Sequence, residues 1–143
     1  MKKSYFIIAV ILIVLSMSST FAYATDYYDE VSPRYSYIMS IVPVLVIDDD
    51  GNSAASIHVS PSDMDAVDRV TATVTIRNLN TGNAVATWRD KPFSFSQLAA
   101  MYMLDLEYRL STPGRYMLEA SISLYDGSIL RERVNVTSNV VSF

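Results

Sequence analysis

Aspartate residues gather at two places where a metal ion or a pair of catalytic carboxylates could act. The first, residues 48–52, reads Asp-Asp-Asp-Gly-Asn and begins like a calcium-binding loop. An EF-hand loop needs glycine at position six and glutamate at position twelve, but these positions hold Ser53 and Val59. The second group lies within residues 63–68, and the intervening segment, if extended, spans roughly 25 Å. That exceeds the roughly 5 to 9.5 Å between the carboxylates of a glycosidase. We expect two solvated acidic turns without a metal, and leave open only weak calcium binding at residues 48–52.

Nucleophilic catalysis has little support in the sequence. The chain has no cysteine, which excludes thiol nucleophiles and thiolate metal sites. Its one histidine, His58, lies between Ile57 and Val59, and in a strand it points away from both toward solvent. No G-x-S-x-G sequence is present to place a serine on a strained turn. The sequence therefore predicts a protein that is not an enzyme, with no catalytic residue and no cofactor.

Exposed aromatic and apolar residues near the start of the predicted domain indicate a binding surface. Residues 41–47 are apolar at nearly every position, so alternate side chains in a strand form two apolar faces. If the domain is a β-sandwich, it has one hydrophobic interior, so one of these faces meets solvent or a partner. Two tyrosines just upstream share a face if their segment is extended. The candidate interaction surface is therefore Tyr35, Tyr37, Val42, Val44 and Val46.

The first 24 residues have the order of a secretory signal peptide. Lysines occupy positions 2–3, an apolar run covers residues 5–15, and Ala22 and Ala24 supply the small residues of a cleavage site. The apolar run is shorter than the roughly 20 residues that span a bilayer. We expect cleavage before Thr25 and a secreted protein, extracellular or associated with the cell wall. The alternative is an uncleaved segment that anchors the chain in the membrane.

The predicted organisation is a signal peptide at residues 1–24, a polar lead-in at 25–34 and one domain at 35–143. Removing the signal peptide changes the net charge from −4 to −6. A chain this acidic lacks the cations that bind nucleic acid, and we therefore expect no nucleic-acid partner. Without disulfides, the stability of the domain must come from its hydrophobic core.

The apolar and polar residues of the domain alternate with a period of two, which is typical of half-buried strands. Pro43 confines its strand to a sheet edge or a bulge. Glu132 falls at an apolar position of its strand, and it likewise predicts an edge or a bulge there. A serine, a proline and an acidic residue within 60–63 predict one short helical turn. Seven strands are predicted, at residues 41–47, 55–59, 70–77, 84–88, 103–110, 115–124 and 129–137.

Two aromatic residues favour an immunoglobulin-like arrangement of these strands. Tyr116 starts a strand two residues after Gly114, which is where that fold has its tyrosine corner. Trp88 ends a strand and is expected to pack in the core. The predicted fold is an all-β, antiparallel, immunoglobulin-like β-sandwich of about seven strands, preceded by an N-terminal signal-peptide helix.

The chain resembles small secreted proteins of Gram-positive bacteria that have one immunoglobulin-like domain of unknown function. The resemblance rests on the signal peptide, residues 32–38 (Ser-Pro-Arg-Tyr-Ser-Tyr-Ile), the strand pair ending in Trp88, Tyr116 and residues 126–127 (Asp-Gly). It implies export and fold, and it transfers no activity.

The expected function is that of a secreted, non-catalytic binding or structural module for an extracellular protein or glycan. One alternative is a carboxylate-based hydrolase of cell-wall or extracellular glycans. Another is a surface protein that associates with itself through the apolar edge strand, Val42 to Val46.

Overall fold

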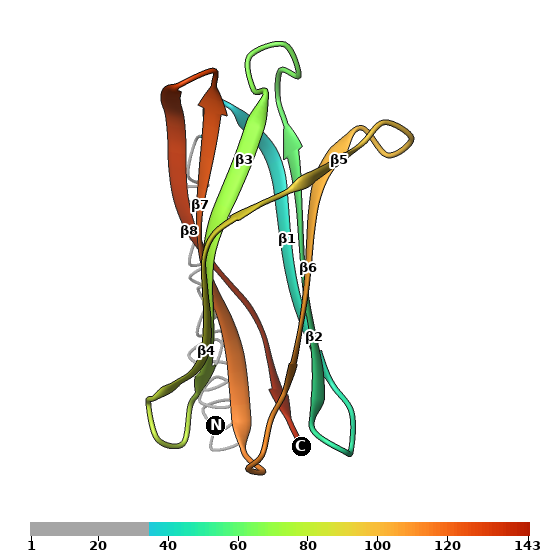
Figure 1. Cartoon of the computed structure of the whole chain (residues 1–143), viewed down its shortest axis with the longest axis vertical. Coiled ribbons are helices and arrows are strands. Elements are labelled where there is room, and N and C mark those ends of the chain that lie inside the picture. Colours follow the sequence, from blue (N-terminus) through green and yellow to red (C-terminus); the bar gives the residue numbers. More distant parts are fainter. Residues whose placement is uncertain (1–34) are drawn as a thin grey trace, which may run out of the picture. The chain divides into compact units, whose positions relative to one another are not determined.

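The computed structural model describes residues 35–143, which form an all-β domain (Figure 1). The expected signal peptide, its cleavage residues Ala22, Ala24 and Thr25, and the lead-in lie outside these residues. Among the residues described, no helix is long and apolar enough to cross a membrane. The strands are β1 (Ile38–Ile47), β2 (Asn52–Pro61), β3 (Arg69–Asn78), β4 (Ala84–Pro92), β5 (Ser94–Ser96), β6 (Met101–Arg109), β7 (Arg115–Asp126) and β8 (Ile129–Ser142).

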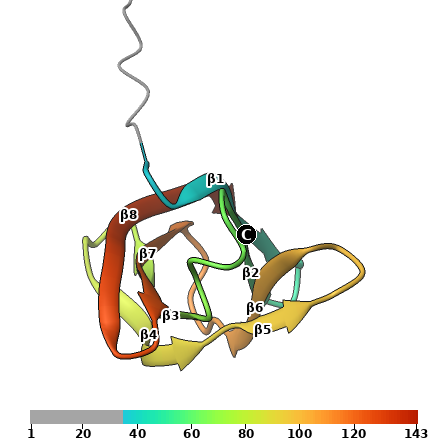
Figure 2. The same ribbon diagram turned by 90° about the horizontal axis from the view of Figure 1, so that it is seen from above.

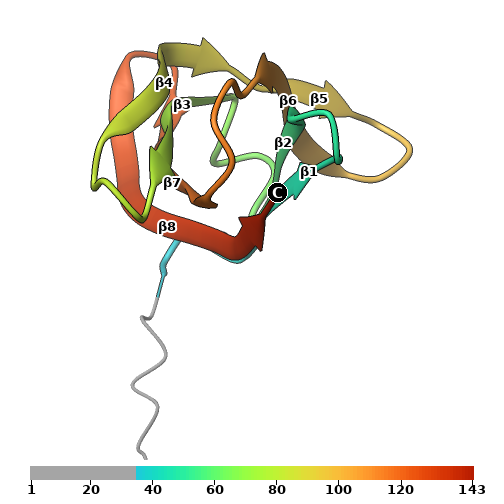
Figure 3. The same ribbon diagram turned by 90° about the horizontal axis from the view of Figure 1, so that it is seen from below.

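The eight strands form two antiparallel sheets of four strands each. Sheet A has the order β1-β2-β6-β5 and sheet B the order β4-β3-β7-β8. The sheets face each other as a β-sandwich, seen end-on in Figures 2 and 3, where β1 and β8 meet along one side. If β1, β2, β6 and β5 are lettered A, B, E and D, sheet A has the strand order ABED of an immunoglobulin-type sandwich.

The period-two alternation places one face of each central strand in the core. In β3, Val70, Ala72, Val74 and Ile76 are buried, and the threonines between them point outward. β7 buries Leu118, Ala120, Ile122 and Leu124 in register with β3, so the inner faces of both strands are apolar. Because a slip of one residue would turn these side chains to solvent, the pattern fixes the register.

Tyr116 joins the end of the sandwich to the connection before β7. The side chain is 1% exposed, and its hydroxyl donates to the carbonyl oxygen of Thr112 four residues upstream. The amide of Asn78 donates to the same hydroxyl at 3.2 Å, and Gly114 lies against the ring. This is the geometry of a tyrosine corner.

Trp88 lies in β4 and is half-buried. Its ring packs against the core and meets Tyr108 edge-on, with ring centroids 6.1 Å apart. Because β4 is an edge strand of sheet B, Trp88 closes one side of the core.

Two details of the prediction are wrong. Residues 60–63 form no helical turn, because β2 continues to Pro61 and Asp63 then accepts the backbone N–H of Asp65 in a short turn. The sandwich also has eight strands, because the three residues Ser94–Ser96 form the short β5, which pairs with β6. The irregularity expected at Glu132 is present, since the β7–β8 register shifts beside it and β8 is an edge strand.

Candidate functional site

The outer face of β1 carries a row of exposed apolar side chains. Val42, Val44 and Val46 are 49%, 37% and 58% exposed, whereas Leu45 between them is 1% exposed. Strand periodicity places the three valines on one side of sheet A, about 7 Å apart along the strand. We call Val42, Val44 and Val46 the valine row. Of the two apolar faces expected from residues 41–47, this one points away from the core.

The backbone edge beside the valine row is closed by β8. The side-chain amide of Asn139 accepts a hydrogen bond from the N–H of Leu45 at 3.1 Å and donates to its carbonyl oxygen at 3.0 Å. Leu45 thus points its backbone groups away from β2, and by the two-residue period Pro43 does the same but has no N–H. The edge that a partner strand would need is therefore partly occupied by Asn139 and lacks a donor at Pro43.

The start of β1 is held by β8 in a similar way. The carboxylate of Glu132 accepts the backbone N–H groups of Tyr37 at 2.9 Å and Ser36 at 3.3 Å. The rings of Tyr35 and Tyr37 are half-buried and pack against the core. These two tyrosines, expected in the interaction surface, therefore cover the core and do not extend the valine row.

Beside the valine row, the outer face of sheet A becomes polar and acidic. Val46 pairs with Ala54 of β2 and Val44 with Ser56, so the side chains next to these two valines are small. Val42 pairs with His58. Ala54 and Ser56 pair in turn with Glu107 and Asp105 of β6. A hollow at one end of this face is lined by Val46, Asp48, Asn52, Ser53, Ala54, Glu107, Tyr108 and Arg109. The face thus has an apolar margin on β1 and two carboxylates on β6, where Arg109 follows at the end of the strand.

Ser56, His58 and Asp105 meet on this outer face. The Ser56 hydroxyl donates to Asp105 Oδ1 at 2.6 Å, and its Oγ lies 3.2 Å from His58 Nε2. In a catalytic triad the serine proton goes to the histidine, and the carboxylate binds the other ring nitrogen. Here the serine stands between the other two groups. β2 pairs with strands on both sides, so its N–H groups are committed to the ladders and offer no oxyanion hole. The arrangement is therefore a polar contact between strands and does not constitute a triad.

The acidic turn at residues 48–52 is organised by its own hydrogen bonds. Asp48 Oδ1 accepts the N–H groups of Asp50 at 3.0 Å and Asn52 at 2.8 Å, and Oδ2 accepts the Asn52 amide at 2.9 Å. The hydrogen bonds from Asn52 hold the pKa of Asp48 below its ordinary value. Gly51 sits here at a φ of 80°, where an added Cβ would meet the carbonyl oxygen of Leu110 at 2.6 Å. The carboxylate that would start a calcium loop is thus occupied by protein donors.

The second acidic group lies at the opposite end of β2. Asp63 and Asp68 bind backbone N–H groups, of Asp65 and Gly127 respectively. Strand β2 separates this group from residues 48–52, as the sequence predicts (Figure 1). No group of three or more histidine or carboxylate side chains able to hold a metal ion occurs within residues 35–143.

The part that sequence reasoning missed is the contribution of β8. Asn139 closes the β1 edge from a position 94 residues away, and its only sequence signal is that asparagine is unfavourable in a strand. For the outer face of sheet B, with its hydroxyl and guanidinium groups, the alternation predicts only the polar side of half-buried strands.

Comparisons with known proteins give structural matches of low sequence identity. No protein family matches the sequence, and no curated protein matches it either. Among solved structures, the chain is similar to a CARDB domain of Pyrococcus furiosus in complex with di-metal ions. That match has 13% identity, covers 76% of this chain and 90% of the other, and has a TM-score of 0.42. A beta-glucuronidase of Ruminococcus gnavus matches at 12% identity over 70% of this chain and 15% of its own, with a TM-score of 0.34.

Proposed function

We propose that this chain is a secreted, non-catalytic binding module with an immunoglobulin-like fold, which recognises an extracellular protein through the valine row. The observation that carries the proposal is the exposure of three aligned valines on one outer face. A solvated sheet face ordinarily carries polar side chains, as the threonines of β3 do. An aligned apolar row on such a face supports a surface that another molecule covers.

The closed edge of β1 favours binding through side chains and disfavours strand pairing. Because Asn139 occupies the backbone groups of Leu45 and Pro43 has no N–H, a partner strand cannot extend sheet A there with a full ladder. The partner instead contacts side chains on the face of the sheet. Its own surface should be apolar opposite the valines and basic opposite Asp105 and Glu107.

The hydrolase alternative receives less support from the carboxyl groups. A glycan hydrolase needs a carboxyl group with a raised pKa to act as general acid. Glu119 and Asp48 both have lowered pKa values, because Arg77 and Asn52 respectively donate hydrogen bonds to their charged forms. A carboxyl group with a lowered pKa is ionised near neutral pH and has no proton to donate.

The test selects binding peptides from a random display library against the wild-type domain, then measures them on two variants. Val44→Lys places a charge in the middle of the valine row, while Thr71→Lys places the same charge on the outer face of sheet B. We expect the selected peptides to be apolar and basic, to lose affinity for Val44→Lys and to keep it for Thr71→Lys.

Two outcomes would refute the proposal. If both lysine variants bind alike, the valine row is not the binding surface. If Val44→Lys unfolds the domain, as read by circular dichroism, the valines belong to the core. Light scattering on the same samples separates the self-association alternative, because a wild-type oligomer that Val44→Lys dissolves would identify a second copy as the partner.

A further inference from the structure

The charges of the domain are divided between its two sheets. Of the eight lysine and arginine residues within 35–143, seven lie on the strands of sheet B and only Arg109 lies on sheet A. The described part of the chain is acidic overall, so this is not a consequence of composition. The seven cations of sheet B are Arg69, Arg77, Arg89, Lys91, Arg115, Arg131 and Arg133.

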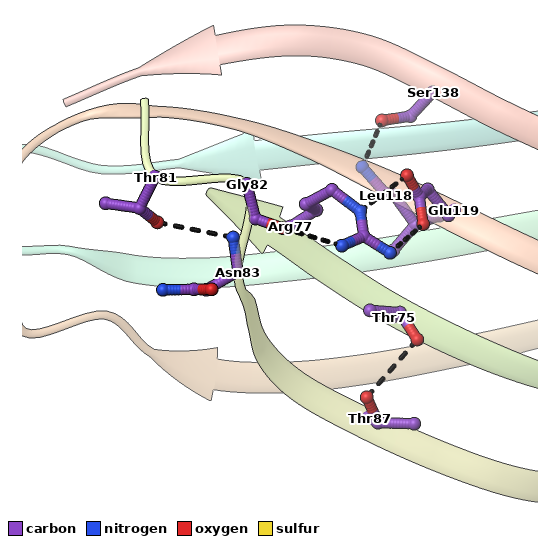
Figure 4. A network of polar contacts seen from close by, with 9 residues as sticks. All are labelled: Thr75, Arg77, Thr81, Gly82, Asn83, Thr87, Leu118, Glu119 and Ser138. Atoms are coloured by element: carbon purple, nitrogen blue, oxygen red, sulfur yellow. Dashed lines mark hydrogen bonds and ion pairs between the residues drawn. The ribbon is translucent and has the colours of Figure 1, made fainter. Parts of the chain in front are cut away.

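Most carboxylates of sheet B are already engaged. Glu119 forms a two-pronged pair with Arg77, with both oxygens at 2.8 Å from guanidinium nitrogens (Figure 4). Asp126 pairs with Arg131, and Glu132 accepts the backbone of β1. The only other carboxylate on these strands is that of Asp90. Five cations of sheet B, all but Arg77 and Arg131, therefore have no carboxylate partner among the described residues.

The outer face of sheet B has a hollow whose floor is polar. It is lined by Thr73, Thr75, Glu119, Ala120, Ser121, Asn135, Val136 and Thr137. The cross-strand row through its middle is Thr73, Ser121 and Asn135, which pair across β3, β7 and β8. The floor thus offers hydroxyl and amide groups that both donate and accept hydrogen bonds. The one carboxylate of the lining, Glu119, is paired with Arg77, and the lining includes no aromatic ring.

Arginines lie on both edge strands of this sheet, β4 and β8. Thr87 of β4 faces outward, because its hydroxyl lies 3.2 Å from that of Thr75. Arg89 follows two residues later, at the bulge where the β3–β4 register shifts opposite Thr73. The backbone N–H of Asp90 in this bulge donates to the Thr73 hydroxyl at 3.5 Å, so the bulge lies beside the floor. On the far side, the Nε of Arg133 donates to the Ser123 hydroxyl at 3.0 Å. The strand spacing puts β4 and β8 about 14 Å apart across the sheet. Arg89 and Arg133 therefore lie on the two edge strands of the sheet whose outer face carries the polar floor.

We propose that this outer face of sheet B, centred on Thr73, Ser121 and Asn135 and flanked by Arg89 and Arg133, binds an anionic polysaccharide. Guanidinium groups recognise carboxylates in a two-pronged geometry, as Arg77 and Glu119 do at the end of the same face. The hydroxyl and amide floor matches the hydroxyl groups of sugar rings. Single-stranded nucleic acid fits less well, because its binding sites supply aromatic rings on which bases stack.

The site is independent of the valine row, because the two lie on the outer faces of opposite sheets. A partner on sheet A and a polymer on sheet B can therefore bind together. The failure of one proposal does not touch the other.

The test measures binding of the domain to polygalacturonate by calorimetry, with neutral dextran and polyglutamate as comparison polymers. We expect binding to polygalacturonate that weakens as salt is raised, with weaker binding to polyglutamate and none to dextran. The double variant Arg89→Gln/Arg133→Gln should lose about tenfold in affinity. The control Arg109→Gln removes a cation from sheet A and should bind as the wild type does.

A second variant, Ser121→Ala, tests the floor without altering charge. It should weaken polygalacturonate binding and leave polyglutamate binding unchanged. Equal binding of polyglutamate and polygalacturonate would mean that the face recognises charge alone and would overturn the polysaccharide assignment. Absence of binding, or equal loss in Arg109→Gln and the double variant, would overturn the site itself.

Discussion

Removing the hydroxyl of Tyr116 should destabilise the domain without disturbing its fold. The Tyr116→Phe substitution keeps the buried ring, which packs beside Phe143 with ring centroids 5.9 Å apart. It deletes the donor to the Thr112 carbonyl and the acceptor for the Asn78 amide. The perturbation is therefore confined to two hydrogen bonds at the end of β7.

The magnitude follows from the surroundings of the two groups left behind. Asn78 is 5% exposed, so its amide loses a partner where water has little access. Thr112 is exposed, so its carbonyl oxygen can turn to water at little cost. One buried group left unsatisfied costs about 1 to 3 kcal/mol. Urea unfolding followed by tryptophan fluorescence should show this as a midpoint lowered by roughly 1 M.

The matched control is Tyr108→Phe. Tyr108 is 39% exposed, and within the described residues its hydroxyl makes no hydrogen bond. We expect its midpoint to stay within experimental error of the wild type. If Tyr116→Phe also leaves the midpoint unchanged, the corner hydrogen bonds contribute nothing and the ring alone fixes the connection. A collapse of the folded state would contradict the argument in the other direction, since the ring and its packing are kept.

Two further predictions concern β8 and the Arg77 pair. Asn139→Ala should open the β1 edge and lower the unfolding free energy by about 1 to 3 kcal/mol. Self-association, measured by light scattering, should rise, and unchanged association would show that the edge is blocked by other means. The pKa of Glu119 lies below its ordinary value of 4.5, mainly through the hydrogen bonds from Arg77, so its stabilisation is present above that pH and lost as pH falls through the lowered pKa. Glu119→Gln should therefore be less stable than the wild type at pH 7 and approach it in acid, and a difference that is constant with pH would refute this.

The central strands could be predicted from the sequence because their inner faces are unambiguous. In β3 apolar and polar residues alternate from Arg69 to Arg77, in β7 they alternate from Leu118 to Leu124, and both strands are paired on each side. Residues 41–47 are apolar on both faces of their strand. Because a sandwich has one interior, the sequence still predicts that one of the two faces is exposed, and the exposure of the valine row confirms this. Pro43 and Glu132 marked edge strands, since each departs from the pattern that a central strand requires.

The missed features depend on contacts between distant segments. Asn139 and Leu45 meet only because β8 and β1 lie side by side where the two sheets close. The helical turn expected at residues 60–63 failed for a related reason. A proline at a first helical position is a local preference, and pairing of Pro61 with Ile38 of β1 overrides it. The strand β5 has three residues, too few for any periodicity to be visible.

The closed edge and the exposed face of β1 have different physical consequences. An open edge strand with three outward valines would pair with any available strand, and such pairing is unselective because the backbone carries no sequence information. The side chain of Asn139 forms hydrogen bonds with the backbone N–H and carbonyl groups of Leu45, and Pro43 nearby has no N–H to donate. Pairing through the backbone is thereby suppressed while the side chains of the valine row stay accessible. The domain can then keep an apolar surface exposed, as the proposed recognition of a partner requires, without the aggregation that an unprotected edge would cause.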